Sequence, residues 1–166
     1  MIGLKTVPAE ERNISFVFQD VGLWPHMSVK DHLKFVLRNK GSKGMDAEIK
    51  GLLEVVGLEG NLDSKPSELS GGEKQRLAIS RAMSQKSDIV LFDEPLSSLD
   101  IHLKKEITTL LKTLRKEYNL TMVYVTHNIF DLTDMCKRVG LIENGKISRI
   151  ENAKSIFKRQ LPLFMG

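Results

Sequence analysis

One stretch, residues 65–100, constrains the fold of this chain more than any other part of the sequence. It contains the apolar run 89–92, which has the length and composition of a buried strand, and Pro95 stops that strand shortly afterwards. Asp93 and Glu94 follow at the C-terminal end of the run. Carboxylates in that position can hold Mg²⁺ and orient a water molecule.

The same stretch contains a second chemical device, Ser-Gly-Gly-Glu at residues 70–73, at the start of a run with helical apolar spacing. A hydroxyl and unpaired backbone N–H groups at the positive end of a helix form an anion site. Each device alone has a plainer interpretation. A Ser-Gly-Gly sequence is usually a turn or an ordinary helix cap, and Asp-Glu-Pro is usually a solvated turn.

The flanking pattern predicts a parallel sheet. An amphipathic helix follows Asp100, and residues 121–126 read as a second strand, so strand, helix and strand form a βαβ unit. Residues 13–18 read as a further strand. Because ligands bind at the C-terminal ends of parallel strands, we predict an α/β protein with an active site made by the polar residues at these ends. These residues are Gln19, Asp93, Glu94 and His127.

The remaining elements are read from local signals. Amphipathic helices are predicted at residues 28–39, with Ser28 and Asp31 as a capping box, and at 45–57. Asn144-Gly145 predicts the turn of a hairpin, and a short helix is expected over residues 153–158.

The loop after Gln19 carries two large apolar residues, Leu23 and Trp24. They face a partner or seal the loop onto the core, and their residue types alone do not decide between the two.

Composition narrows the classes of protein. A chain of 166 residues that is 41% hydrophobic can bury one core, so we expect a single domain. The net charge of +4 is spread among 21 acidic residues without a basic arm, and we expect no nucleic-acid partner. We find no signal peptide and no membrane-span pattern, and the single cysteine fits a reducing compartment.

Taken together, Leu-Ser-Gly-Gly-Glu-Lys-Gln-Arg at 69–76, Asp-Glu-Pro at 93–95 and Leu-Ser-Ser-Leu-Asp at 96–100 resemble the signature motif, Walker B strand and D-loop of ATP-binding cassette (ABC) ATPases. Residues 16–29 look like the Q-loop of the importer subgroup. The resemblance implies a partial P-loop NTPase fold with a parallel sheet, flanking helices and a helical subdomain at about residues 25–85. The remainder of residues 1–166 would be a RecA-like core, within one N-terminally truncated ABC ATPase domain.

The resemblance also implies the cofactors ATP and Mg²⁺ and a role for each candidate residue. Glu94 polarises the attacking water, and Asp93 and Gln19 bind Mg²⁺. His127 contacts the γ-phosphate, although Asn128 stands where the importer subgroup typically has aspartate. In a head-to-tail dimer of two ATPase subunits, the residues that reach the opposite ATP are Ser70, Gly71, Gly72, Glu73 and Asp100. Leu23 and Trp24 meet the transmembrane permease, which places the protein in the cytoplasm on the inner face of the membrane.

One departure from the family is large, since the chain contains no G-x-x-x-x-G-K-[ST] phosphate loop (Walker A). We therefore expect a fragment of an ATP-hydrolysing importer subunit that hydrolyses nothing alone. We also expect a missing strand beside 89–92, with unpaired edges, exposed apolar faces and poor solubility. The alternative is a naturally short, catalytically silent half that supplies its signature motif to another chain. A DNA-repair or chromosome ATPase would require long heptad arms, which are absent from the sequence.

Overall fold

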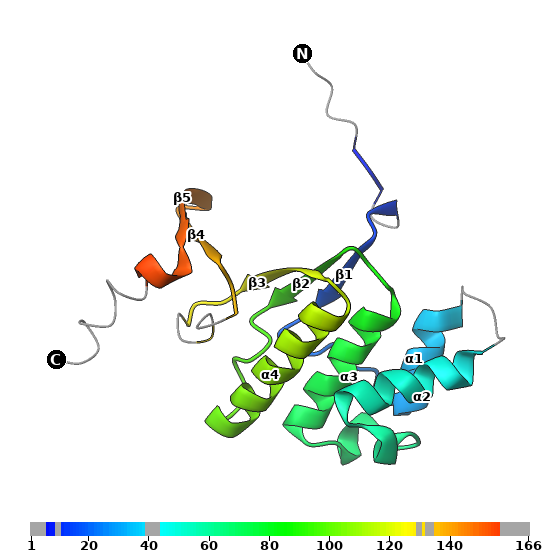
Figure 1. Cartoon of the computed structure of the whole chain (residues 1–166). Helices are drawn as coiled ribbons and strands as arrows, with labels where there is room; N and C mark the ends of the chain where they lie inside the picture. Colours follow the sequence, from blue (N-terminus) through cyan, green and yellow to red (C-terminus); the bar gives the residue numbers. More distant parts are fainter. Residues whose placement is uncertain (1–5, 9–10, 39–43, 129–130, 132–134, 157–166) are drawn as a thin grey trace. The chain divides into compact units, whose positions relative to one another are not determined.

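The computed structural model describes residues 6–8, 11–38, 44–128, 131 and 135–156. The chain divides into two compact units, residues 1–125 and residues 126–166, and each is described by itself. Figure 1 shows the elements of both units.

The first unit is built on a parallel sheet of three strands in the order β1-β2-β3. The strands are β1 (Ile14–Val17), β2 (Ile89–Asp93) and β3 (Thr121–Val125). In register, Val17 lies opposite Phe92, and Phe92 lies opposite Tyr124. The prediction of an α/β fold with a parallel sheet is confirmed.

The strand expected to be missing beside 89–92 leaves no unpaired edge on that strand, and the unpaired edges of the described sheet lie on β1 and β3. Strand β2 pairs along its length with β3 on one side and with β1 on the other. The order of strands in a parallel sheet is set by crossover connections and not by local sequence, so the apolar run showed that the strand is buried without showing its neighbours.

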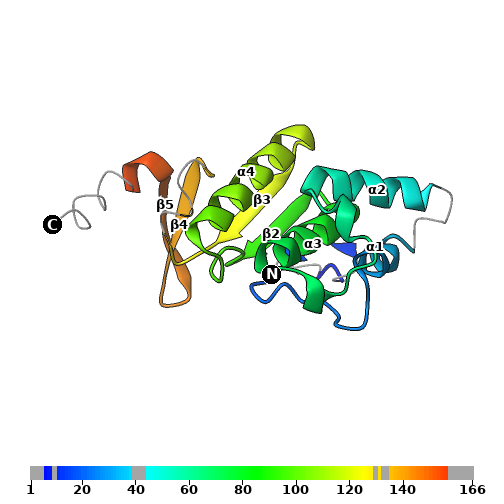
Figure 2. The ribbon, with the colours of Figure 1, turned by 90° about the horizontal axis from the view of Figure 1, so that it is seen from below.

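Helices α3 (Gly71–Ser84) and α4 (Ile101–Glu117) cover one face of this sheet, as the two views show (Figures 1 and 2). Alternate side chains along the strands are buried, as expected for strands with one covered face. The fully buried residues of these strands and helices include Val17, Val90, Phe92, Ile79, Ile107 and Leu111.

The other face of the sheet remains exposed among the described residues. The strand alternation places on it Ile14 and Phe16, each 40% exposed, and Val123 and Val125, each 47% exposed. A row of exposed aliphatic and aromatic side chains of this kind marks a surface that something else covers or an aggregation liability. The expected exposure of apolar faces is therefore confirmed.

Helices α1 (Val29–Leu37) and α2 (Met45–Val56) pack with α3 around a separate apolar cluster. Ser28 and Asp31 form the predicted capping box, in which the Ser28 hydroxyl accepts from Asp31 N–H at 3.2 Å. The buried members of the cluster are Val29, Leu33, Leu37, Ile49, Leu53, Val56, Leu58, Leu69 and Leu77. These helices fall within residues 25–85, and the predicted division into a helical subdomain and a core stays a prediction.

The segment between α2 and α3 contains two short 3₁₀ turns, η3 (Glu59–Asn61) and η4 (Pro66–Glu68). Its carbonyls serve the start of α1, because Ser64 O accepts from Val29 N–H and Leu62 O from Lys30 N–H, each at 2.9 Å. First-turn N–H groups have no partner within their own helix, so this segment caps α1 from outside.

The second unit contains the predicted hairpin, formed by β4 (Arg138–Glu143) and β5 (Lys146–Asn152). Asn144 and Gly145 have φ values of 51° and 74°, as a two-residue primed turn requires. Residues 153–156 are helical, and the rest of the predicted terminal helix lies outside the described residues. Within the described ranges, no helix combines the length and apolarity needed to cross a membrane.

A valine-to-threonine substitution is expected to change the free energy of unfolding differently on the two faces of the sheet. Val90 is 1% exposed on the covered face and Val123 is 47% exposed on the open face. We expect Val90→Thr to lower the free energy of unfolding by about 1–3 kcal/mol, because it buries a hydroxyl, and Val123→Thr to change it by less than about 0.5 kcal/mol. Urea unfolding measures both. Equal losses would show that the open face is covered in solution.

Candidate functional site

The C-terminal ends of β1 and β2 bring three candidate residues to one edge of the sheet. The two strands are parallel and Val17 lies opposite Phe92, so Gln19 follows β1 at the edge where Asp93 ends β2 and Glu94 follows. Gln19 is exposed, whereas both carboxylates are partly buried. This edge therefore presents one amide and two carboxylates.

The backbone fixes Glu94 in an unusual conformation. Its φ is 45°, in the left-handed region that residues with a side chain rarely adopt. Its N–H donates to Val125 O at 2.9 Å, and its carbonyl accepts from the Ser97 hydroxyl at 3.0 Å. Such strain persists only where surrounding bonds enforce it, and it is common at functional sites.

The donor set at this edge suits Mg²⁺, which prefers oxygen ligands and usually takes one or two carboxylates with the rest from phosphate and water. Asp93 and Gln19 supply a carboxylate and an amide oxygen. Over the part of the chain that the structure describes, no group of three or more His, Cys, Asp and Glu side chains could hold a metal by itself. The residues therefore fit a Mg²⁺ ion that is completed by a phosphate ligand.

Helix α3 begins with a capping box that we did not predict, although the Ser-x-x-Glu spacing signals it. Ser70 donates to the Glu73 carboxylate from its hydroxyl at 2.7 Å and from its backbone N–H at 2.8 Å. These two bonds hold the pKa of Glu73 below its ordinary value. Glu73 therefore orients Ser70, and the first-turn N–H groups of Gly71 and Gly72 have no acceptor within the helix.

The start of α3 packs against the start of α4. A Cβ atom added to Gly72 would lie 2.8 Å from Leu103 Cδ2, and one added to Gly71 would lie 3.7 Å from Leu99 Cδ2. Asp100 caps α4, since its Oδ1 accepts from His102 N–H at 2.9 Å and from Leu103 N–H at 3.0 Å. The structure thus brings residues 70–73 and Asp100 together at two adjacent helix N-termini.

His127 lies in the second unit, so its approach to Asp93 and Glu94 stays a prediction. The residue is exposed. Its neighbour Asn128 serves the local turn, donating from its backbone N–H to Thr126 Oγ1 at 3.0 Å and from its side chain to Asp131 Oδ1 at 3.2 Å.

The loop before α1 is packed onto the molecule. Leu23 contacts the apolar cluster of the helices. The Trp24 ring stacks on His32 with centroids 5.4 Å apart, and it meets Phe35 edge to face at 4.9 Å. Both Leu23 and Trp24 are partly buried, which supports the sealing interpretation and leaves only part of each side chain for a partner.

His32 anchors this loop, and no local pattern of residues indicates this role. Its Nε2 accepts from Trp24 N–H at 2.9 Å, so Nδ1 carries the proton and donates to Ser28 O at 2.7 Å. The pKa of His32 is lowered, mainly by burial and further by Arg81 and His26, against the opposing effects of Ser28 O and Asp31. The ring is therefore held neutral.

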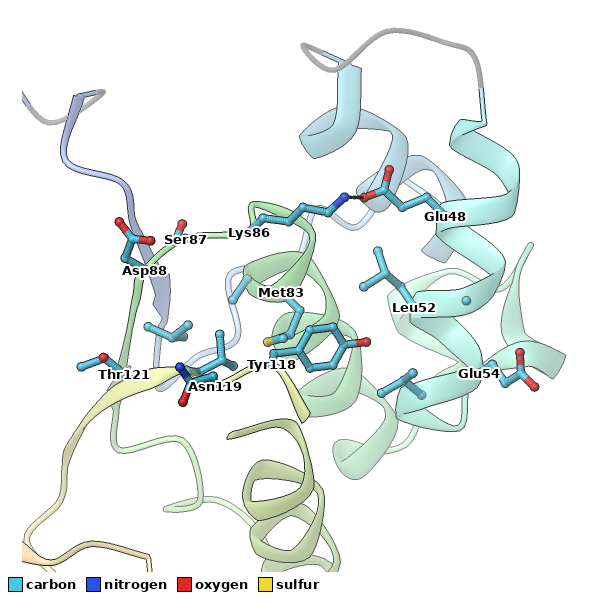
Figure 3. Close-up of a pocket in the computed structure, with 15 residues that line it drawn as sticks. Glu48, Leu52, Glu54, Met83, Lys86, Ser87, Asp88, Tyr118, Asn119 and Thr121 are labelled. Atoms are coloured by element: carbon cyan, nitrogen blue, oxygen red, sulfur yellow. Dashed lines mark ion pairs between the residues drawn. The ribbon is translucent and has the colours of Figure 1, made fainter. Parts of the chain in front are cut away.

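A pocket of about 950 Å³ lies away from all of these residues. It is lined by α2, the end of α3 and the residues that begin β2 and β3, at the opposite edge of the sheet. Figure 3 shows the ion pair between Lys86 and Glu48, 2.8 Å long, on one side of it, with Leu52, Met83 and Tyr118 pointing toward one another. No predicted site residue lines this pocket.

Comparison with known proteins supports the interpretation of the motifs. The family model described as "ABC transporter" matches residues 2–97. The sulfoquinovosyl glycerol transport ATP-binding protein SmoE of Agrobacterium fabrum is 34% identical over 162 residues, which are 96% of this chain and 45% of that protein.

Two proteins named for import are similar over nearly the same share of this chain. The spermidine/putrescine import ATP-binding protein PotA of Aggregatibacter actinomycetemcomitans is 38% identical, covering 98% of this chain and 44% of that protein. The molybdenum import ATP-binding protein ModC of Pasteurella multocida is 39% identical, covering 96% of this chain and 44% of that protein. The chain thus spans about half the length of the curated relatives it matches.

The environment of His32 predicts a pH dependence of stability. The ring is held neutral in the folded chain and titrates at its ordinary pKa of about 6.5 in the unfolded chain. The unfolded chain therefore binds more protons below that pH, so this contribution to stability is complete above about pH 6.5 and is lost as the pH falls toward the lowered pKa. Urea unfolding between about pH 7 and about pH 5.5 should show the loss.

His32→Gln should remove this part of the pH dependence. His102→Gln, a change in the exposed histidine of α4, should keep it. An unchanged slope in His32→Gln would contradict the assignment.

Replacing Gly71 and Gly72 at the start of α3 by alanine is expected to change the free energy of unfolding by different amounts. Alanine at Gly71 meets ordinary contact distances, whereas alanine at Gly72 requires the end of the Leu103 side chain to shift. We expect Gly72→Ala to be less stable than Gly71→Ala by about 0.5–1.5 kcal/mol, because Leu103 has to leave its rotamer, measured by denaturant unfolding. Leu103→Ala opens room and should shrink the difference. A difference that persists with Leu103→Ala would place the cause elsewhere.

Proposed function

The chain belongs to the ABC transporter family, and we propose that it carries the later part of an ATP-hydrolysing subunit that energises solute import. The parallel pairing of β1 with β2 is the observation that carries the proposal, because it sets Gln19, Asp93 and Glu94 at one edge. An amide and two carboxylates are the groups that Mg²⁺ and an attacking water require in phosphoryl transfer.

In this proposal each residue of the edge has a role. Glu94, held by its bonds to Val125 and Ser97, polarises the water. Asp93 and Gln19 hold Mg²⁺, which neutralises charge on the phosphates when it is bound. His127 contacts the γ-phosphate. ATP is the other cofactor.

The second group of residues serves the other subunit of a head-to-tail dimer. Ser70, Gly71 and Asp100 are exposed at the adjacent starts of α3 and α4, where backbone N–H groups and helix dipoles favour an anion. Gly72 allows the two helices to approach, and Glu73 orients Ser70. We propose that this pair of helix ends closes over the ATP held by the partner subunit.

The given sequence lacks one element that ATP hydrolysis requires. Its 166 residues contain no phosphate loop, the element whose backbone N–H groups and lysine cradle the β- and γ-phosphates. We therefore propose that this chain hydrolyses no ATP alone and acts with a phosphate loop supplied by another polypeptide segment.

The proposed partners are a second ATPase subunit and a transmembrane permease that meets the loop at Leu23 and Trp24. The chain would then lie on the cytoplasmic face of the membrane through that permease. The similar proteins are named for different solutes, namely sulfoquinovosyl glycerol, spermidine or putrescine, and molybdenum, so no one solute is proposed.

A catalytically silent half is the second candidate, favoured only by the missing phosphate loop. It would supply the start of α3 to another chain's ATP and leave Glu94 unused. The same experiment separates the two candidates.

We expect the purified chain to release no phosphate from Mg-ATP above the blank. In an assembly that supplies the phosphate loop, Glu94→Gln should lower kcat at least about 100-fold and preserve ATP binding, because only water activation is lost. Asp88→Asn is the matched control, a carboxylate at the opposite end of β2 that accepts from the Asn13 side chain. Hydrolysis by the chain alone, or full activity of Glu94→Gln, would overturn the main proposal.

A further inference from the structure

Arg81, near the end of α3, contacts the loop that precedes α1. Its Nη1 donates to Gly22 O at 2.6 Å, and its guanidinium carbon lies 4.8 Å from the centre of the Trp24 ring. Burial lowers its pKa from the ordinary value, and its Nε is buried without a partner in the described part of the chain. A desolvated cation over an indole ring interacts more strongly than an exposed one.

The other side of this loop is fixed to α1. His32 accepts from Trp24 N–H at 2.9 Å and stacks on its ring, and Phe35 contacts the ring edge. The loop at residues 22–24 is therefore clamped between α1 and α3, with Arg81 as a hydrogen-bonded and ring contact from α3.

Helix α3 connects the contacts of Arg81 with this loop to the helix start at Ser70 and Gly71. It starts at Gly71 beside the capping Ser70, and Arg81 is ten positions further on, about 15 Å along the helix axis. The start of α3 abuts α4 at Gly72 and Leu103. The helix is continuous from Gly71 to Ser84, so we expect a displacement of its start to move Arg81 as well.

We propose that Arg81 is the positioning residue that couples the start of α3 to the loop at Gly22 and Trp24. A nucleotide that displaces Ser70 and Gly71 moves the loop through Arg81, and a partner bound at Trp24 acts on the start of α3 by the same contact, because such coupling is reciprocal. The nucleotide and permease in this statement rest on the proposed function. The mechanical link does not, and it can be tested without ATP.

Arg76 is a matched arginine on the same helix with different contacts. Its Nη1 donates to Val56 O at 3.0 Å and its Nη2 pairs with Glu106 at 2.8 Å. It therefore joins α3 to α2 and α4 and does not contact the loop, which makes it the control for loss of an arginine from α3.

The test uses Trp24, the single tryptophan of the chain, as the reporter. Gly72→Val is designed to displace the start of α3, because its branched side chain enters the space of the Leu103 side chain, where a Cβ alone would lie 2.8 Å from Cδ2. Emission maximum and acrylamide quenching of Trp24 are measured with and without Gly72→Val in three backgrounds, namely wild type, Arg81→Met and Arg76→Met. Methionine keeps the apolar stem and removes the guanidinium.

We expect Gly72→Val to shift the emission and raise the quenching constant in wild type and in Arg76→Met, and to leave both unchanged in Arg81→Met. Leu103→Ala, which makes room for the valine, should restore the wild-type signal. A shift that persists in Arg81→Met, or no shift in wild type, would overturn the coupling. Failure of the proposed function would appear separately, as absent ATP hydrolysis once a phosphate loop is supplied.

Discussion

The pairing of β2 with a parallel strand on each side is the constraint on which the rest of this structure depends. It carries Asp93 and Glu94 to the edge where β1 delivers Gln19, and it supplies the Val125 carbonyl that holds Glu94 in its left-handed conformation. Without the pairing, two carboxylates after an apolar run would be an ordinary solvated turn.

A second organising device is the pair of helix starts at Gly72 and Asp100. At Gly72 the start of α3 closely approaches the Leu103 side chain of α4, and each helix has a side-chain cap, Ser70 for α3, held by Glu73, and Asp100 for α4. In the proposed function, these two adjacent helix starts form one anion-binding surface. The chain thus carries half of one proposed ATP site at the sheet edge and half of another at the helix starts.

Local signals in the sequence predicted the elements well. The run at residues 89–92, the capping box of Ser28 and Asp31, and the Asn144-Gly145 turn each depend on neighbouring residues, and the structure contains all three. Contacts between distant segments could not be predicted this way. Local patterns did not indicate that β2 lies between β1 and β3. They also did not indicate that Gly72 lies against Leu103, or that Arg81 donates to Gly22, 59 positions away. The candidate site was therefore found by residue type and spacing, while the residues that position it required the structure.

The most direct measurement of the central claim is a disulfide cross-link in an assembled pair of subunits. The account predicts that Ser70→Cys, in a chain with its native Cys136 replaced by serine, cross-links to a cysteine placed in the phosphate loop of the partner subunit when ATP is present. It predicts little cross-linking without nucleotide. Cross-linking that ignores ATP, or that joins Ser70→Cys only to a phosphate loop bound to the same subunit, would contradict a composite site shared between two subunits.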